Sequence, residues 1–393
     1  MSNLAIQFHL LLFFSIPIAL TTAQLGKLEV RSNKNVAMFV FGDSVFDPGN
    51  NNYIDTSIGG KANFPPYGET FFRYPTGRVC DGRILPDFAA AYAGLPYWRP
   101  YLDPDNHNFV VGANFGSAGG AVLVETNPYT INLELQVFYM KKVASLLKEE
   151  LGDENASELL KGAIYLSSLG GVDYMAFSNS TSDPTEAEME AYVKIVIGNI
   201  TNAVKDIYAL GGRKFAFQNV GPLGCQPENK QSYNTTGCVE LLQTLASMHN
   251  DVLNTVAEEL ASELPGFKYL IFDYFTTVME RTENPTKYGF KEGDIACCGS
   301  GTHRGDGCGY LTVAYELCSN PNEYVFFDGG HPTEAANIQL TELLWNGTTN
   351  VTWPINLSQL VELDSTDVKI STENVDILID QRVASGRVSK ANV

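Results

Sequence analysis

The chain has 393 residues, of which 44% are hydrophobic and 18% are charged, and its formal net charge is −19. This composition predicts a globular protein with a large core and excludes a mainly disordered chain. Nucleic acid and anionic membrane surfaces would repel so acidic a protein, so we expect neither as a partner.

The first 23 residues have the pattern of a secretory signal peptide. Residues 4–20 are mostly apolar, and small residues precede the cleavage site that we predict after Ala23. The positive charge before this segment comes from the amino terminus alone. A retained membrane span is the less favoured alternative, because Pro17 interrupts the apolar run and no basic residue flanks it. An uncleaved core helix is the other alternative. No later segment is apolar enough to span a bilayer.

The predicted elements alternate between strand and helix along the chain. The strands are predicted at residues 36–41, 109–115, 163–169, 214–220 and 267–273, and the helices at residues 83–92, 131–151, 191–210, 239–264, 274–281 and 334–345. Such alternation indicates an α/β fold with a parallel sheet and helices on both faces. Neither a repeat nor a linker interrupts it, so residues 24–363 are predicted as a single domain. Residues 364–393 are polar and are predicted to be a mobile or processed extension.

Two further features suggest export. Seven Asn-x-Ser/Thr sequons predict a glycosylated surface. They begin at Asn155, Asn179, Asn199, Asn234, Asn346, Asn350 and Asn356. Six of the seven cysteines gather in two glycine-containing stretches, as disulfide-stapled loops do, and their pairing stays open. These candidates are Cys225, Cys238, Cys297, Cys298, Cys308 and Cys318, and the odd one is Cys80.

The second cysteine-rich stretch has one alternative interpretation. Cys297, Cys298, His303 and Cys308 are residue types that can bind a metal. Adjacent cysteines and irregular spacing fit disulfides better than a zinc site, so we predict disulfides.

A serine stands where an α/β enzyme would place a nucleophile. The first predicted strand breaks at Gly42, and Asp43 and Ser44 follow directly. Open α/β sheets bind their ligands just beyond the carboxyl ends of the strands. Ser44 is therefore a candidate nucleophile, although the same residue type also commonly caps a following helix.

A histidine near the other end of the chain is the matching candidate base. His331 follows the strand-like run 324–327, precedes a predicted helix and has Asp328 three residues before it. Across the intervening Gly-Gly turn, the carboxylate can hydrogen-bond to one imidazole nitrogen. The other imidazole nitrogen can then accept a proton from a serine. Alternatively, Asp328 caps the helix at Pro332 and His331 is a surface residue.

The segments Phe41-Gly-Asp-Ser44 and Asp328-Gly-Gly-His331 resemble those of the GDSL esterase/lipase family, the plant branch of the SGNH hydrolases. The resemblance extends from about residue 36 to about residue 360. Within that branch, the chain looks most like the secreted defence-related lipases. Further blocks occur in the family's order, namely Asn114-Phe-Gly-Ser-Ala-Gly119, Gly221-Pro-Leu-Gly-Cys225, Lys287-Tyr-Gly-Phe290 and Ala296-Cys-Cys-Gly-Ser-Gly301.

The resemblance implies a flavodoxin-like three-layer sandwich, the SGNH hydrolase fold, with a parallel five-stranded sheet. It implies hydrolysis of small-molecule or lipid esters through an acyl-enzyme on Ser44, with His331 as general base and Asp328 orienting it. The backbone N–H groups of Ser44 and Gly119 would form part of the oxyanion hole. The resemblance implies no cofactor and no metal.

One position departs from the family pattern. The family carries Gly-x-Asn-Asp, whose Asn amide is a third oxyanion donor, whereas this chain has Val172 in the corresponding segment from Gly170 to Asp173. Loss of such a donor typically costs roughly 100- to 1,000-fold in turnover. Val172 would also make the pocket more apolar around a bulky acyl group.

Two alternatives to hydrolysis therefore stay open. The acyl group on Ser44 can pass to an alcohol instead of water, which a drier pocket favours. The chain can also be a catalytically weakened protein retained for binding in defence. In each case we expect a monomer exported to the extracellular space or apoplast, with the vacuole as an alternative destination.

Overall fold

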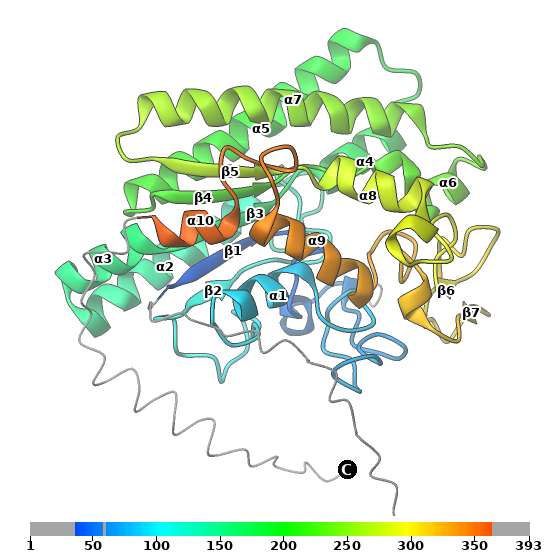
Figure 1. Cartoon of the computed structure of the whole chain (residues 1–393), viewed down its shortest axis with the longest axis horizontal. Coiled ribbons are helices and arrows are strands. Elements are labelled where there is room, and N and C mark those ends of the chain that lie inside the picture. The colour runs from blue at the N-terminus through cyan, green and yellow to red at the C-terminus, as the bar shows by residue number, and fades with distance from the viewer. Residues whose placement is uncertain (1–35, 58–59, 364–393) are drawn as a thin grey trace, which may run out of the picture. The chain divides into compact units, whose positions relative to one another are not determined.

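A central mixed sheet organises the computed structural model, which describes residues 36–57 and 60–363 (Figure 1). The strand order is β2-β1-β3-β4-β5-β8, and all neighbours pair in parallel except β5 and β8. The strands are β1 (Met38–Gly42), β2 (Gly112–Asn114), β3 (Ile164–Ser168), β4 (Lys214–Gln218), β5 (Lys268–Phe272) and β8 (Thr352–Trp353). The predicted five parallel strands are confirmed, and the short antiparallel strand β8 extends the sheet at one edge.

Helices connect the strands on both faces of the sheet. They are α1 (Leu85–Tyr92), α2 (Leu133–Leu151), α3 (Asp153–Gly162), α4 (Gly171–Ser180), α5 (Glu186–Ala209), α6 (Pro227–Ser232), α7 (Glu240–Glu263), α8 (Tyr274–Glu283), α9 (Glu334–Asn346) and α10 (Leu357–Glu362). Residues of α2, α3, α5 and α7 share one hydrophobic core, and residues of α1, α8, α9 and α10 share the other. This arrangement is the three-layer α/β sandwich that the sequence predicts.

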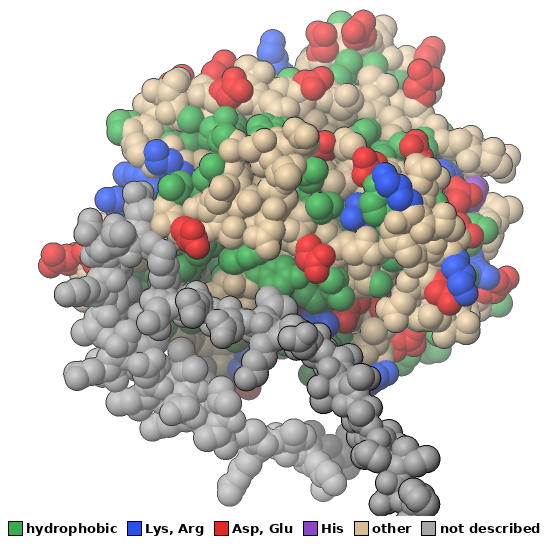
Figure 2. Space-filling model, in the orientation of Figure 1, with side chains coloured by type: hydrophobic (Ala, Val, Ile, Leu, Met, Phe, Trp, Pro, Cys, Tyr) green, Lys and Arg blue, Asp and Glu red, His purple; other side chains and the backbone are tan. Residues whose placement is uncertain are grey.

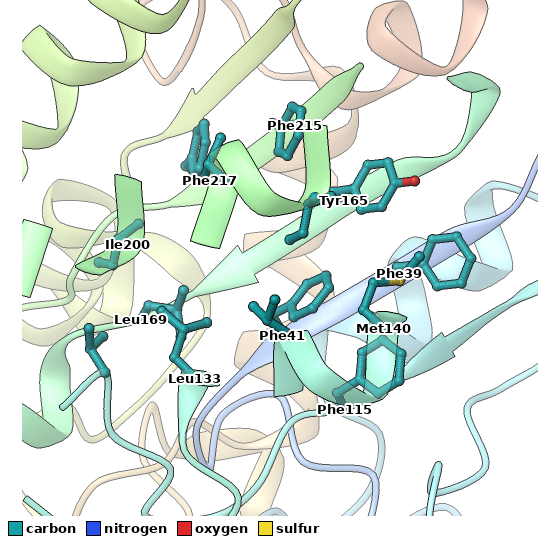
Figure 3. Packing of buried hydrophobic residues seen from close by; sticks show 14 of the residues in the cluster. Phe39, Phe41, Phe115, Leu133, Met140, Tyr165, Leu169, Ile200, Phe215 and Phe217 are labelled. Atoms are coloured by element: carbon teal, nitrogen blue, oxygen red, sulfur yellow. The ribbon is translucent and has the colours of Figure 1, made fainter. Parts of the chain in front are cut away.

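Side-chain alternation along the strands builds both cores. Phe39 and Phe41 of β1 face the first core, whereas Met38 and Val40 face the second, as expected of a strand buried on both sides. Figure 3 shows the first core, where aromatic rings from neighbouring strands lie against one another. The ring centroids of Phe39 and Tyr165 are 5.5 Å apart, so β1 and β3 are joined by packing as well as by hydrogen bonds.

The strand order places a topological switch point beside β1. The chain leaves β1 toward β2 at one edge and then crosses to β3 on the opposite side of β1. The connection through α1 packs in one core, and the connection through α2 and α3 packs in the other. A crevice opens at such a point in doubly wound folds, at the carboxyl ends of the strands. Ser44 follows β1 directly and therefore lies at this crevice.

Several elements differ from the prediction. The strand-like run 324–327 lies outside the main sheet, because its backbone bonds to the cysteine-rich loop; for example, the N–H groups of Cys297 and Cys298 donate to the carbonyls of Phe326 and Phe327. Helix α5 begins five residues before the predicted start because Thr185 and Glu188 form a capping box. The sequence prediction also missed α3, α4, α6 and α10, and the small hairpin of β6 (Cys298–Gly299) and β7 (Glu316–Leu317).

The cysteine prediction is confirmed within the described residues. The disulfides are Cys225–Cys238, Cys297–Cys318 and Cys298–Cys308, and Cys80 is free and buried. The cysteines of the alternative metal site are thus bonded to one another or to Cys318. These two disulfides cross-link the loop region that precedes His331.

The described surface carries both charge signs and no long apolar helix. Acidic and basic side chains are scattered over the face seen in Figure 2, without a continuous basic area. Among the helices of residues 36–57 and 60–363, none combines the length and apolar character that a bilayer crossing requires. The predicted signal peptide (residues 1–23) and the predicted extension (residues 364–393) lie outside the described residues.

Candidate active site

Ser44 and His331 meet across the crevice although 287 residues separate them in the sequence. The Oγ atom of Ser44 lies 2.7 Å from Nε2 of His331. The other ring nitrogen, Nδ1, lies 2.6 Å from Oδ1 of Asp328. The three side chains therefore form one continuous hydrogen-bonded line, which is the geometry that activates a serine hydroxyl.

Hydrogen bonds fix the end of β1, two residues before Ser44. Gln136 of α2 accepts a hydrogen bond from the N–H of Gly42 and donates one to its carbonyl, each at 2.9 Å. A Cβ atom at Gly42 would come within 2.9 Å of the carbonyl oxygen of Ser168, so glycine is required there. The turn after Ser44 leads to a 3-10 helix whose N-cap is Gly49. The alternative reading of Ser44 as a helix cap is therefore wrong.

Asp328 is held by several donors besides His331. Its Oδ1 accepts from the N–H groups of Gly330 and His331, and its Oδ2 accepts from the Tyr67 hydroxyl at 2.8 Å. The N-cap of α9 is Thr333, so the alternative reading of Asp328 as that cap is also wrong. Sequence reasoning missed Tyr67, because nothing near it in the chain indicates a partner 261 residues away.

Asp81 and Arg83, which follow Tyr67 in the chain, contact the first residue of α9. Arg83 forms an ion pair with Glu334 at 2.7 Å, and its N–H donates to the same carboxylate. Asp81 accepts from the N–H of Glu334 at 2.8 Å. These contacts fix the position of the helix that directly follows His331, and hence the imidazole.

Asp328 and His331 each favour the charged form of the other. Burial disfavours the ionised form of Asp328, but His331 and the hydrogen bonds outweigh it and lower the pKa of the carboxyl group. Burial likewise opposes the imidazolium form of His331, but the Asp328 carboxylate outweighs it and raises the pKa of the imidazole. Asp328 thus stabilises the imidazolium form of His331.

Two backbone N–H groups are available beside the serine. Within the described residues, neither the N–H of Ser44 nor that of Gly119 has a hydrogen-bond acceptor, and both residues line the same pocket. Gly119 adopts φ +76°, a conformation that favours glycine. Asn127 and Thr130 both donate to its carbonyl at 3.1 Å. These hydrogen bonds fix Gly119 from its carbonyl side, while its N–H, in the preceding peptide group, remains free.

Val172 lies at the start of α4 and lines the same pocket. Asp173 beside it is buried and accepts from the N–H groups of Val122 and Leu123. This carboxylate thus ties α4 to the segment that follows Gly119. The third block of the family pattern therefore lies at the pocket wall, where the Val172 side chain offers no hydrogen-bond donor.

The pocket around Ser44 has a volume of about 380 Å³. Its wall is built by segments that follow β1, β2, β3, β4 and β5, together with the loops before α9. Apolar side chains of Leu169, Val172 and Met175 contribute to it. The charged lining consists of carboxylates and His331: no Lys or Arg lines the pocket within the described part of the chain.

Glu228 is a further carboxylate beside the catalytic line, and sequence reasoning missed it. Its N–H donates to the carbonyl of Gly329 at 2.8 Å, and a Cβ atom at Gly330 would lie 2.7 Å from its Oε1. Burial raises the pKa of Glu228 to about 7, while the His331 charge opposes this shift. The charge of Glu228 in turn helps to raise the pKa of His331.

This arrangement makes a prediction about pH. Only neutral His331 accepts a proton, so kcat/KM should fall with decreasing pH through a pKa above the ordinary value of 6.5. Glu228→Gln removes a charge that raises this pKa, so the acid limb should move to lower pH. A pH profile of ester hydrolysis measures the shift, with exposed Glu259→Gln as the control. Coincident acid limbs for Glu228→Gln and the wild type would contradict the assignment.

Comparisons with known proteins show the family of the chain. Residues 38–344 match the family described as GDSL-like Lipase/Acylhydrolase. The chain is 46% identical over 355 residues to GDSL esterase/lipase 1 of Arabidopsis thaliana, covering 86% of this chain and 95% of the relative. It is 45% identical over 333 residues to a GDSL lipase of Tanacetum cinerariifolium, covering 84% and 89%.

A further relative bears on activity. The chain is 39% identical over 327 residues to a protein of Arabidopsis thaliana named Inactive GDSL esterase/lipase-like protein 25, covering 83% of this chain and 75% of that one. Overall likeness extends to a relative named as inactive, so the assignment of a mechanism rests on the residues of this pocket.

Proposed function

The chain belongs to the GDSL-like lipase/acylhydrolase family and is a carboxylic ester hydrolase, and we propose that it acts through an acyl-enzyme on Ser44. His331 is the general base, and Asp328 orients it. The observation that carries the proposal is the contact of 2.7 Å between Ser44 Oγ and His331 Nε2, continued by the contact of 2.6 Å to Asp328.

The proposed reaction has two halves. His331 Nε2 takes the hydroxyl proton while Ser44 Oγ attacks the ester carbonyl carbon, and the N–H groups of Ser44 and Gly119 stabilise the oxyanion. The tetrahedral intermediate collapses, the bond to the alcohol breaks, and His331 returns its proton to the leaving oxygen. Water then attacks the acyl-enzyme with His331 as base. The bond between the acyl carbon and Ser44 Oγ breaks, His331 returns the proton to that oxygen, and the carboxylic acid leaves. Asp328 keeps the Nδ1–H tautomer throughout.

Acyl transfer is the second candidate, because the apolar side chains of Val172, Met175 and Leu169 line the pocket and disfavour water. Purified protein is incubated with p-nitrophenyl esters of several chain lengths, with and without an acceptor alcohol. Acid release supports hydrolysis. A new ester that forms only with the acceptor supports transfer. Inactivity on every ester, equal to that of Ser44→Ala, would favour the third possibility, a binding protein in defence.

The missing third donor yields a prediction of its own. Val172→Asn supplies a side-chain amide at the position where the family carries one, so kcat is expected to rise roughly 100-fold or more. Val172→Leu is the matched control, because it fills similar space without a donor. Turnover of p-nitrophenyl esters measures the effect. A Val172→Asn variant no faster than Val172→Leu would show that this donor does not limit the reaction.

We further propose that the protein is exported as a glycosylated monomer to the extracellular space or, alternatively, the vacuole. Its disulfides support an oxidising compartment. All sequon asparagines except Asn356 are exposed. Asn356 is half-buried and caps α10 through its side-chain oxygen, so it is the least accessible of the seven. We therefore expect Asn356 to be the least modified sequon.

A further inference from the structure

The proposed mechanism leaves one buried polar group of the pocket unused. Gln218 is the last residue of β4, is only 3% exposed and lines the pocket together with Ser168. Its Nε2 donates to the Ser168 hydroxyl at 3.0 Å. Its Oε1 is buried and has no hydrogen-bond partner. Buried side-chain oxygens are normally paired, so this one requires an explanation.

Other residues that line the pocket also carry hydrogen-bond acceptors. Asp43 is 8% exposed, and Oδ1 of its carboxylate accepts from the N–H of Val45. Within the described residues, the Glu228 carboxylate receives no hydrogen bond. No Lys or Arg lines the pocket in that part of the chain, so no cationic side chain there donates to these oxygens. A ligand that fits this wall must bring a donor.

We propose that the natural substrate is an ester bearing a free hydroxyl group, which donates a hydrogen bond to Oε1 of Gln218. This inference rests on the proposed function, because it concerns the same pocket. A wholly apolar ester would bury the Gln218 oxygen and the Asp43 carboxylate against carbon, which is unfavourable for both. A hydroxyl group satisfies the neutral amide oxygen without introducing a charge. Gln218 is thus a specificity-determining residue.

The hydroxyl group can belong to either half of the ester, and matched substrates distinguish the two. Ethyl butyrate, ethyl 3-hydroxybutyrate and ethyl 3-methoxybutyrate vary the acyl half. Propyl butyrate and 2,3-dihydroxypropyl butyrate vary the alcohol half. Acid release gives kcat/KM for each. In at least one series, the wild type should prefer the hydroxylated ester by about 10-fold, the usual range for one uncharged hydrogen bond. The enzyme should not prefer ethyl 3-methoxybutyrate over ethyl butyrate, because the methoxy group has no hydrogen-bond donor.

Gln218→Met tests the residue directly, because methionine has a similar size and no amide. The preference ratio between hydroxylated and plain esters should fall to about one. Gln339→Met is the control, since Gln339 forms its hydrogen bonds with Arg281 and Tyr288 instead. This control should retain the wild-type ratio.

Three results would overturn the proposal: equal wild-type rates within both series, an equal preference for the methoxy ester, or a Gln218→Met variant that keeps the ratio. The first two need no variant, so the proposal can fail even if Gln218→Met does not fold. Absence of all Ser44-dependent hydrolysis would instead count against the proposed function. The two failures are therefore distinguishable.

Discussion

Replacing Ser44 with alanine is expected to reduce kcat/KM for a p-nitrophenyl ester by about 10⁴-fold or more. The variant lacks the oxygen that lies 2.7 Å from His331 Nε2, so no acyl-enzyme can form. The N–H groups of residue 44 and Gly119 remain, and they account for any residual rate. Thermal melting should be little changed, because Ser44 lies on a turn and, within the described residues, its side chain hydrogen-bonds only to His331.

The matched control is Ser180→Ala, at the exposed end of α4. It removes a hydroxyl group from the same protein and should retain wild-type kcat/KM. A Ser44→Ala variant with more than about a tenth of the wild-type rate would exclude Ser44 as the nucleophile, since nucleophile removal elsewhere costs several orders of magnitude.

Asp328→Asn is expected to lower kcat by about 10⁴-fold, with little change in the overall structure. Asparagine retains an oxygen for the N–H groups of Gly330 and His331, but its amide no longer stabilises the imidazolium or fixes the required tautomer. The carboxylate also raises the pKa of His331, so its removal leaves the lowering effect of burial opposed only by the charges of Glu228 and Asp43. The residual activity should therefore have its acid limb at lower pH than the wild type.

A pH profile of kcat/KM measures both effects at once. The Tyr67 hydroxyl, which donates to Oδ2 of Asp328, provides a comparison. Tyr67→Phe leaves the charge in place and should cost far less than Asp328→Asn. Equal losses in the two variants would indicate that the carboxylate acts through local packing and not through its charge.

The sequence predicted the two ends of the catalytic line because each is marked locally. Ser44 follows an apolar run of strand length, and His331 has a carboxylate three residues before it. The regular spacing of apolar residues in α2, α7 and α9 also made these helices recognisable.

The elements that were missed carry weaker local patterns. Helix α4 begins with Gly171 and ends among Ser178, Asn179 and Ser180, so its composition resembles a loop. Helices α6 and α10 each have only six residues. Disulfide pairing could not be derived, since it depends on which loops the fold brings together.

The supporting residues of the site depend on tertiary contacts and have no signature in the sequence. Tyr67 reaches Asp328 across 261 residues, and Gln136 reaches Gly42 across 94. Gln218 is one of many polar residues at a strand end, and only its missing partner sets it apart. The sequence thus indicates the reacting groups, whereas the fold determines what holds them and what the pocket selects.

Covalent labelling with a fluorophosphonate ester tests the central claim most directly. This reagent phosphonylates an activated serine, and mass spectrometry of the digested protein locates the adduct. We predict one adduct per chain, on the peptide that contains Ser44, with labelling abolished in Ser44→Ala and greatly slowed in His331→Ala. Labelling of another residue, or equal labelling of the His331→Ala variant, would contradict the claim that His331 activates Ser44.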